Sequence, residues 1–217
     1  MSQGKLRQYY PLLWMLAIPI LNIFYGILNR PGMKTYDLST RVDEMLPFLP
    51  IFVIPYLIWY PFIAACLVTL FYRNRATYYR TLFALCLGLI ISYIFFYFYQ
   101  SGITRPQLGD GFLYSLVQFV YHNDAPYNCF PSIHVLTTYL MIKSSKQAFP
   151  HAGLRWTIHL LAWSIILSTV FVKQHVLLDI AGGIAVAEIT YFVIGLVPAW
   201  ARSRSRNPGK AFGASSE

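Results

Sequence analysis

The chain has 217 residues, of which 57% are hydrophobic and only 12% are charged, with a mean hydropathy of +0.50. Soluble domains carry about 25% charged residues, so this composition argues against a soluble domain and favours a multi-span helical membrane protein. The net charge of +9 would suggest nucleic acid in a soluble protein, but here the basic residues lie between apolar runs, where they act as topology signals. The three cysteines have no CxxC spacing and predict neither a disulfide framework nor a zinc site. We therefore expect no nucleic-acid partner, no metal and no other cofactor.

The apolar runs predict an all-α, six-span transmembrane bundle that forms one domain over residues 1–200. The predicted spans cover residues 12–28, 46–72, 81–99, 131–146, 156–172 and 176–200. The first run follows Lys5 and Arg7, as in a signal peptide, but no small-residue cleavage site follows, which favours a retained span. The fourth run is shorter than the roughly 20 residues of a crossing. It spans only if Lys143 and Lys146 snorkel toward the membrane surface.

The segments between the runs are polar. Residues 29–44 are expected to form a loop, and residues 100–131 a second one that holds a short amphipathic helix at about 112–121. Prolines at the start of the second run predict kinks or a re-entrant entry. The tail, 201–217, is basic and then Gly/Ser-rich, and it is expected to be a disordered cytoplasmic segment near anionic lipid.

Six spans place both termini on one side of the membrane. The basic residues concentrate in the termini and in the loops on that same side, which assigns both termini to the cytoplasm. His134 and His175 then lie together on the extracytoplasmic side, which places the predicted active site at the outer membrane interface. The small size of the chain favours a bacterial cell membrane.

The start of the fourth run has the features of an anion site. Pro131 suits the first turn of a helix, where its missing N–H costs nothing, and Ser132 offers a hydroxyl group. The free N–H groups and the positive end of the helix dipole would face an anion there. His134, within this first turn, would lie beside that anion.

His175 and Asp179 are four residues apart at the start of the sixth run, so they share one helix face. A carboxylate one turn away can fix the tautomer of the imidazole and leave its other nitrogen as a nucleophile. Two histidines with different partners suit two roles, since one can attack phosphorus while the other protonates the leaving alkoxide. Arg105 and Lys173, on the same predicted side, would neutralise the phosphoryl oxygens.

These stretches resemble a known family. Pro131-Ser132-Ile133-His134 and Ser168-(six residues)-His175-(three residues)-Asp179 look like the second and third signatures of the type 2 phosphatidic acid phosphatase superfamily, and Arg105-Pro106 looks like the end of the first. These six-span enzymes cleave lipid phosphate esters through a phosphohistidine, without a metal. The resemblance implies His175 as nucleophile, Asp179 as its orienting partner and His134 as general acid. It also implies that Arg105, Ser132 and Ser168 bind phosphate, with a lipid phosphate as substrate.

Two family cations are missing. Phe98 stands where the first signature has lysine, and Thr169 stands where the third has arginine; Lys173 is a candidate replacement. The stretches 130–134 and 173–175 look closer to the inositol phosphorylceramide synthase-like branch, which transfers a phospho-head-group between lipids. The expected activity is therefore a lipid phosphatase, with a lipid phosphotransferase as the alternative.

Other interpretations of the same residues stay open. The chain could be a non-catalytic carrier or scaffold that binds lipid head groups. His175 and Asp179 could be a structural pair, or part of a zinc site completed by His122 or Asp124. Glu188, inside the sixth run, is either functional or bonded to a neighbouring helix. The small residues between 181 and 187 predict close helix packing. The sequence does not specify the oligomeric state.

Overall fold

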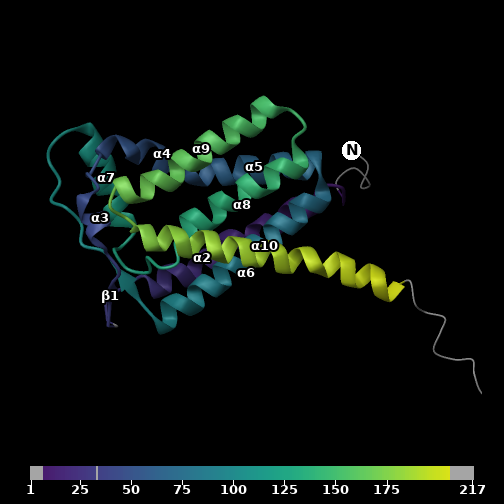
Figure 1. Ribbon diagram of the computed structural model, residues 1–217, viewed down its shortest axis with the longest axis horizontal. Coiled ribbons are helices and arrows are strands. Elements are labelled where there is room, and N and C mark those ends of the chain that lie inside the picture. The colour runs from purple at the N-terminus through teal and green to yellow at the C-terminus, as the bar shows by residue number, and fades with distance from the viewer. Residues whose placement is uncertain (1–6, 33, 206–217) are drawn as a thin grey trace, which may run out of the picture.

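The computed structural model describes the backbone of residues 7–32 and 34–205 and the side chains up to residue 197. Helices make up most of the described chain and run roughly along one long axis (Figure 1). In chain order the elements are η1 (Tyr10–Leu16), α2 (Ala17–Leu28), β1 (Tyr36–Asp37), α3 (Arg41–Met45), η2 (Pro50–Phe52), α4 (Val53–Leu57), α5 (Trp59–Arg73), α6 (Arg75–Phe98), β2 (Ser101–Gly102), α7 (Phe112–Asn123), α8 (Ile133–Ala148), α9 (Ala152–Phe171) and α10 (Leu177–Ser205). The short elements α3, α7 and β1 gather at one end of the bundle.

Five helical segments are long and apolar enough to cross a membrane, which indicates a membrane protein. They are Tyr10–Leu28, Pro50–Arg73, Arg75–Phe98, Ala152–Phe171 and Leu177–Val197. Each corresponds to one of the predicted spans. The remaining predicted span, 131–146, forms α8, which is a helix of 16 residues and does not belong to this group.

Helix α8 lies in the middle of the bundle, where it packs against α5, α6, α9 and α10. Most of its residues are buried, including Leu136, Leu140 and Met141. The hydroxyl groups of Thr137, Ser144 and Ser145 bond within the helix, as when Thr137 Oγ1 donates to the carbonyl of Ile133 at 2.8 Å. A helix enclosed by other helices has little surface facing lipid and tolerates such polar residues, which explains its weak hydropathy signal.

Close approach of α10 to α8 depends on glycine. A Cβ atom at Gly183 would lie 2.6 Å from the carbonyl oxygen of Ser132 and 2.9 Å from Cβ of Val135. Farther along, Glu188 pairs with Lys143 and accepts a hydrogen bond of 2.8 Å from Tyr139, so it joins α10 to α8. The predicted small-residue packing of α10 is confirmed, and Glu188 has the helix-bonding role.

Replacing Gly183 with alanine is expected to push α10 away from α8, because the new methyl group meets backbone and a Cβ atom rather than a flexible side chain. We expect a destabilisation of about 1–3 kcal/mol, measured as a lower unfolding midpoint in detergent. Gly153→Ala in α9 is the matched control, since no atom lies within 4 Å of a Cβ added there. A control that loses as much stability as Gly183→Ala would contradict this packing role.

The predicted loop 29–44 is more ordered than expected. It contains β1, which pairs in parallel with β2, and α3, which starts with a capping box in which Thr40 and Asp43 bond each other's backbone N–H groups. Asp43 Oδ1 also accepts a hydrogen bond of 2.7 Å from the N–H of Leu177, the first residue of α10. The loop prediction was wrong here because the helix is a single short turn, too short to show an apolar period.

The proline-rich entry to the second run breaks into η2, α4 and α5, as the kink prediction stated. Two boundaries differ from the predictions. Helix α6 begins at Arg75 rather than near residue 81, and the side chain of Asn74 caps it. Helix α10 continues to Ser205, past the predicted end of the last span at 200, and 206–217 lie outside the described residues.

Candidate active site

Three predicted residues meet in the structure. His175 Nδ1 lies 3.3 Å from Asp179 Oδ2, and His175 Nε2 lies 3.4 Å from His134 Nδ1. All three side chains are buried, with Asp179 completely so. When Nδ1–H of His175 donates to the carboxylate, the lone pair on Nε2 is directed toward His134. The first turn of α8, the connection between α9 and α10, and the first turn of α10 therefore bring two imidazoles and a carboxylate into one line.

The connection between α9 and α10 fixes the position of His175. The carbonyl of Thr169 accepts hydrogen bonds from the N–H groups of both Gln174 and His175, at 2.9 and 3.0 Å. Lys173 has a φ of 53°, the left-handed conformation that reverses the chain after the helix. Asp179 Oδ2 also accepts from the N–H of Val176 at 2.9 Å, so the carboxylate caps α10 while it contacts His175.

His134 is held from the other side by aromatic rings. Its ring centroid lies 4.0 Å from that of Trp59 and 4.8 Å from that of Tyr56. Ser132 is the N-cap of α8, and its hydroxyl oxygen accepts from the N–H of Val135 at 3.4 Å. Pro131 therefore precedes the cap, whereas the sequence predicted it in the first turn of the helix.

The nitrogens of the two histidines are at hydrogen-bond distance, so the space between them is too small for a phosphoryl group. Any phosphate ester that reacts here must enter while the rings move apart. The room for it lies in two cavities that adjoin the pair. One, of about 380 Å³, is lined by His175, and the other, of about 390 Å³, is lined by His134.

Two of the four predicted phosphate ligands line the cavity beside His175. Arg105 donates to the carbonyl of Tyr121 and, at 2.6 Å, to Gln174 Oε1, and its guanidinium stacks on the Tyr121 ring. Lys173 Nζ donates to the carbonyls of Asp43 and Leu46 at 2.9 and 2.7 Å. Both cations reach the cavity, where backbone and amide oxygens already occupy several of their donors, while Nε of Arg105 is buried without a hydrogen-bond partner in the described part of the chain.

The two predicted serine ligands have local partners. Ser168 donates to the carbonyl of Ile165 in its own helix at 2.6 Å, and Ser132 caps α8 as described above. Both residues are fully buried. They shape the helix ends that carry the histidines, and neither hydroxyl lines either of the two cavities.

The cavity beside His175 carries acidic groups that sequence reasoning missed. Asp37, Asp43 and Glu44 line it together with Arg105 and Lys173. Burial alone would raise the pKa of Asp43, but hydrogen bonds from Thr40 and the N–H of Leu177 hold that pKa below its ordinary value. The cavity therefore presents both signs of charge. The Thr-x-x-Asp pattern at 40–43 was the available signal, since it marks a capped helix start.

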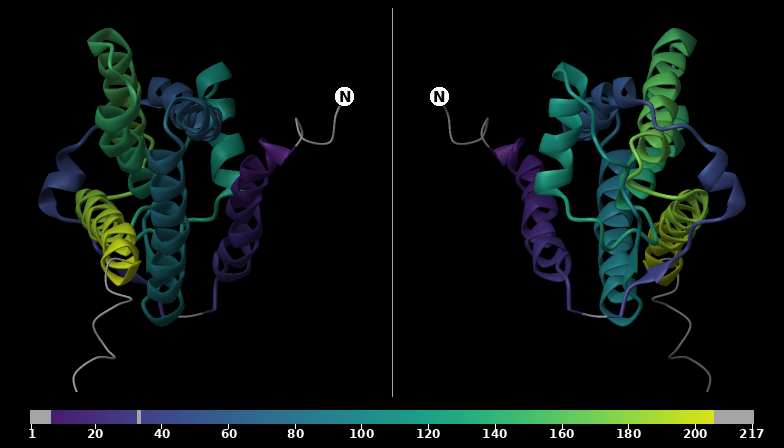
Figure 2. Two further views of the ribbon diagram at one scale, coloured as in Figure 1. Left: turned by 90° about the vertical axis from the view of Figure 1, so that its right-hand side faces the viewer. Right: turned by 90° about the vertical axis from the view of Figure 1, so that its left-hand side faces the viewer.

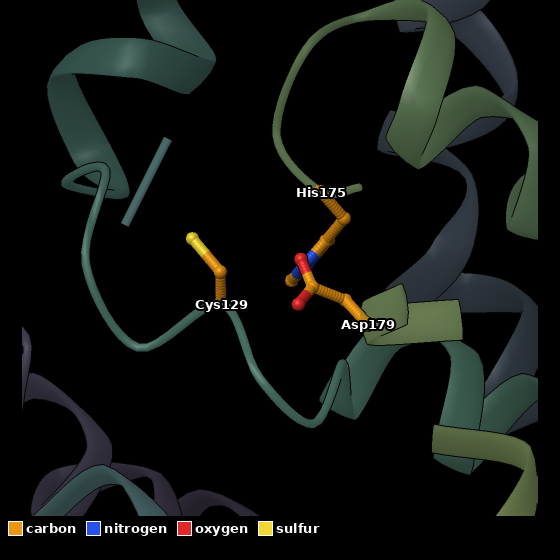
Figure 3. Close-up of side chains that lie close together, drawn as sticks. All are labelled: Cys129, His175 and Asp179. Carbon is orange, nitrogen blue, oxygen red and sulfur yellow. The ribbon is translucent and has the colours of Figure 1, made fainter. Parts of the chain in front are cut away.

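Cys129 joins His175 and Asp179 in a group whose potential metal-ligand atoms lie within 4.8 Å of one another (Figure 3). Burial, reinforced by the nearby carboxylate of Asp179, raises the pKa of the Cys129 thiol well above its ordinary value. A soft divalent ion would have to displace that proton and draw the three donors closer together. This donor set differs from the predicted alternative with His122 or Asp124.

Asp124 has a different environment. Its Oδ1 accepts from Tyr25 at 2.6 Å and from Asn29 at 2.8 Å, and its Oδ2 accepts from Tyr56 at 3.3 Å. This cluster ties α2 and α4 to the end of α7. Gln174 and Asp124 were both missed as positioning residues, because their partners lie between 68 and 99 residues away in the sequence.

No family model, curated protein or solved structure matches this chain. The family resemblance therefore depends on the motif residues and on the geometry that they adopt.

Proposed function

We propose that this protein is a membrane-embedded enzyme that cleaves a lipid phosphate ester through a phosphohistidine on His175, as a lipid phosphatase related to the type 2 phosphatidic acid phosphatases. The observation that carries the proposal is the line of Asp179, His175 and His134. An oriented imidazole with a free nitrogen beside a second imidazole is an arrangement suited to nucleophilic attack followed by protonation of a leaving group.

In the proposed reaction, the lone pair on His175 Nε2 attacks phosphorus as the ester P–O bond breaks. The bonding electrons leave with the lipid oxygen, which takes a proton from His134 in its imidazolium form. Burial disfavours that charged form, and a bound phosphate anion offsets this. Asp179 stabilises the positive charge on the phosphorylated His175 ring. Water activated by His134 then attacks the phosphorus of the phosphohistidine, and the P–N bond breaks to release phosphate from His175.

The proposal includes six spans, with α8 as the sixth. Support comes from its position among the five apolar helices, parallel to the bundle axis (Figure 1). With six spans, the distribution of basic residues supports cytoplasmic termini, and the histidines would then lie at the outer interface. The proposal keeps a bacterial cell membrane, which the small size of the chain supports. Arg105 and Lys173 would then help to hold the phosphate group from the loops at that face.

A lipid phosphotransferase is the second candidate, and the acidic lining of the cavity beside His175 favours it. Asp37, Asp43 and Glu44 would repel the dianion of a phosphate monoester. The same carboxylates would accept hydrogen bonds from a head group that carries hydroxyl groups, as in a phosphodiester lipid. In this reaction a lipid alcohol, rather than water, takes the group from His175.

Purified protein in detergent, supplied with ³²P-labelled lipid phosphates, tests both candidates. We expect acid-labile, alkali-stable label on the protein, followed by free phosphate, or by a labelled new lipid when a lipid alcohol is present. The same products should form in a strong chelator. Activity that is lost with the chelator and restored by one metal would favour the Cys129 donor group. An absence of label and product across a broad panel of lipids would favour binding without catalysis.

A further inference from the structure

The two cavities at the histidine pair differ in character and in the helices that form them. The cavity beside His175 is lined by charged side chains from α3 and the loops. The cavity beside His134 lies between α2, α4, α5 and α7, and its walls include Tyr25, Trp59, Tyr60 and Phe119. Figure 2 shows that α2 lies on the far side of α6 from α10, the helix that carries Asp179. We call the cavity beside His134 the aromatic groove.

The chemistry of in-line displacement assigns the two cavities to different parts of a substrate. The nucleophile and the leaving oxygen stand on opposite sides of phosphorus. If His175 attacks from its side and His134 protonates the leaving oxygen, that oxygen departs on the side that His134 lines. The aromatic groove is the cavity on that side.

The walls of the aromatic groove suit a lipid. Tyr60 and Phe119 at its edge are both 59% exposed, so the groove continues onto an apolar outer surface of the bundle. Its inner part is polar at one point, where Asp124 accepts hydrogen bonds from Tyr25 and Tyr56. A carboxylate with phenol groups can accept a hydrogen bond from a neutral hydroxyl group without burying a second charge.

We propose that the aromatic groove binds a lipid alcohol, with its hydroxyl group near His134 and Asp124 and its hydrocarbon chain between α2, α5 and α7. This inference rests on the proposed function and names the leaving group of that reaction. By microscopic reversibility, an acceptor alcohol enters by the same groove. Its oxygen attacks phosphorus, the P–N bond to His175 breaks with its electrons returning to nitrogen, and His134 takes the alcohol proton.

Gly26 gives a direct test, because it lines the groove and no atom lies within 4 Å of a Cβ added there. Gly26→Trp should fill the groove without disturbing helix packing. We expect turnover of long-chain lipid phosphates to fall about 10²-fold, and turnover of a short-chain ester such as ethyl phosphate, whose leaving alcohol needs little of the groove, to fall far less. Gly153→Trp in α9, also in open space, is the matched control and should leave both rates unchanged.

A second measurement does not depend on turnover. The His175→Ala variant is irradiated with a diazirine-bearing long-chain alcohol, and labelled peptides are mapped. Labelling of α2, α5 and α7 that Gly26→Trp suppresses supports the groove. Labelling elsewhere, or unchanged lipid turnover in Gly26→Trp, overturns it. If the groove is labelled but the wild-type protein turns over no substrate, the proposed chemistry fails, and with it the role of this alcohol as leaving group.

Discussion

Replacing His175 with alanine is expected to abolish turnover, with a loss of roughly 10³-fold or more, while the protein stays folded. The imidazole contacts Asp179 through Nδ1 and faces His134 through Nε2, so alanine removes both the oriented ring and its attacking nitrogen. Its backbone N–H, which bonds to Thr169, remains in the variant. Turnover of a long-chain lipid phosphate in detergent, with the unfolding midpoint measured on the same sample, checks this expectation.

His151→Ala is the matched control, because His151 is an exposed histidine just before α9 and makes no side-chain cap there. It should keep wild-type turnover. A folded His175→Ala variant with normal activity would rule out the phosphohistidine, and it would equally rule out a metal centre that needs His175 as a ligand beside Cys129 and Asp179. If His175→Ala does not fold, His175→Gln takes its place, because glutamine is a polar side chain of similar size that has no nucleophilic nitrogen.

Replacing Asp179 with asparagine should lower turnover by roughly 10³-fold, the scale seen when the carboxylate behind a catalytic histidine is neutralised. Asp179 Oδ2 accepts from both the His175 ring and the N–H of Val176. An asparagine oxygen can keep the bond to Val176, so α10 should still begin at the same place. The variant loses the negative charge that stabilises the phosphorylated ring, and its amide can turn an N–H toward Nδ1.

The split between kcat and KM separates this role from simple damage to the fold. We expect Asp179→Asn to lower kcat with little change in KM and in the unfolding midpoint, whereas Asp110→Asn, at an exposed carboxylate, should leave both kinetic constants unchanged. A nearly wild-type kcat in Asp179→Asn would show that Asp179 only caps α10.

The apolar runs by themselves determined most of the helices. Five of the six predicted spans correspond to helices long and apolar enough to cross a membrane, because lipid-facing surface must be apolar whatever the tertiary contacts. Helix α8 has a weaker hydropathy signal because little of its surface faces lipid. It is enclosed by its neighbours, so its side chains are selected by packing against other helices and not by lipid.

The sequence also predicted one contact of the candidate site, although the structure forms it in a different way. His175 and Asp179 are paired, but His175 lies just before α10, which begins at Leu177, so the two do not share a helix face; the carboxylate in the first turn reaches back to the ring and to the N–H of Val176. The order of the motifs predicted that His134 approaches His175. The distance between the two rings depends on the close packing of α10 against α8, which Gly183 permits.

Only the tertiary structure decided the surroundings of the histidines. Asp43, Cys129 and Gln174 reach the site from three separate segments, and no local pattern predicts such long-range contacts. The predicted serine ligands bond instead within their own helix ends, since a buried hydroxyl group takes the nearest carbonyl or N–H partner. The two cavities on either side of the histidine pair likewise arise from helix packing, which brings together side chains far apart in the chain.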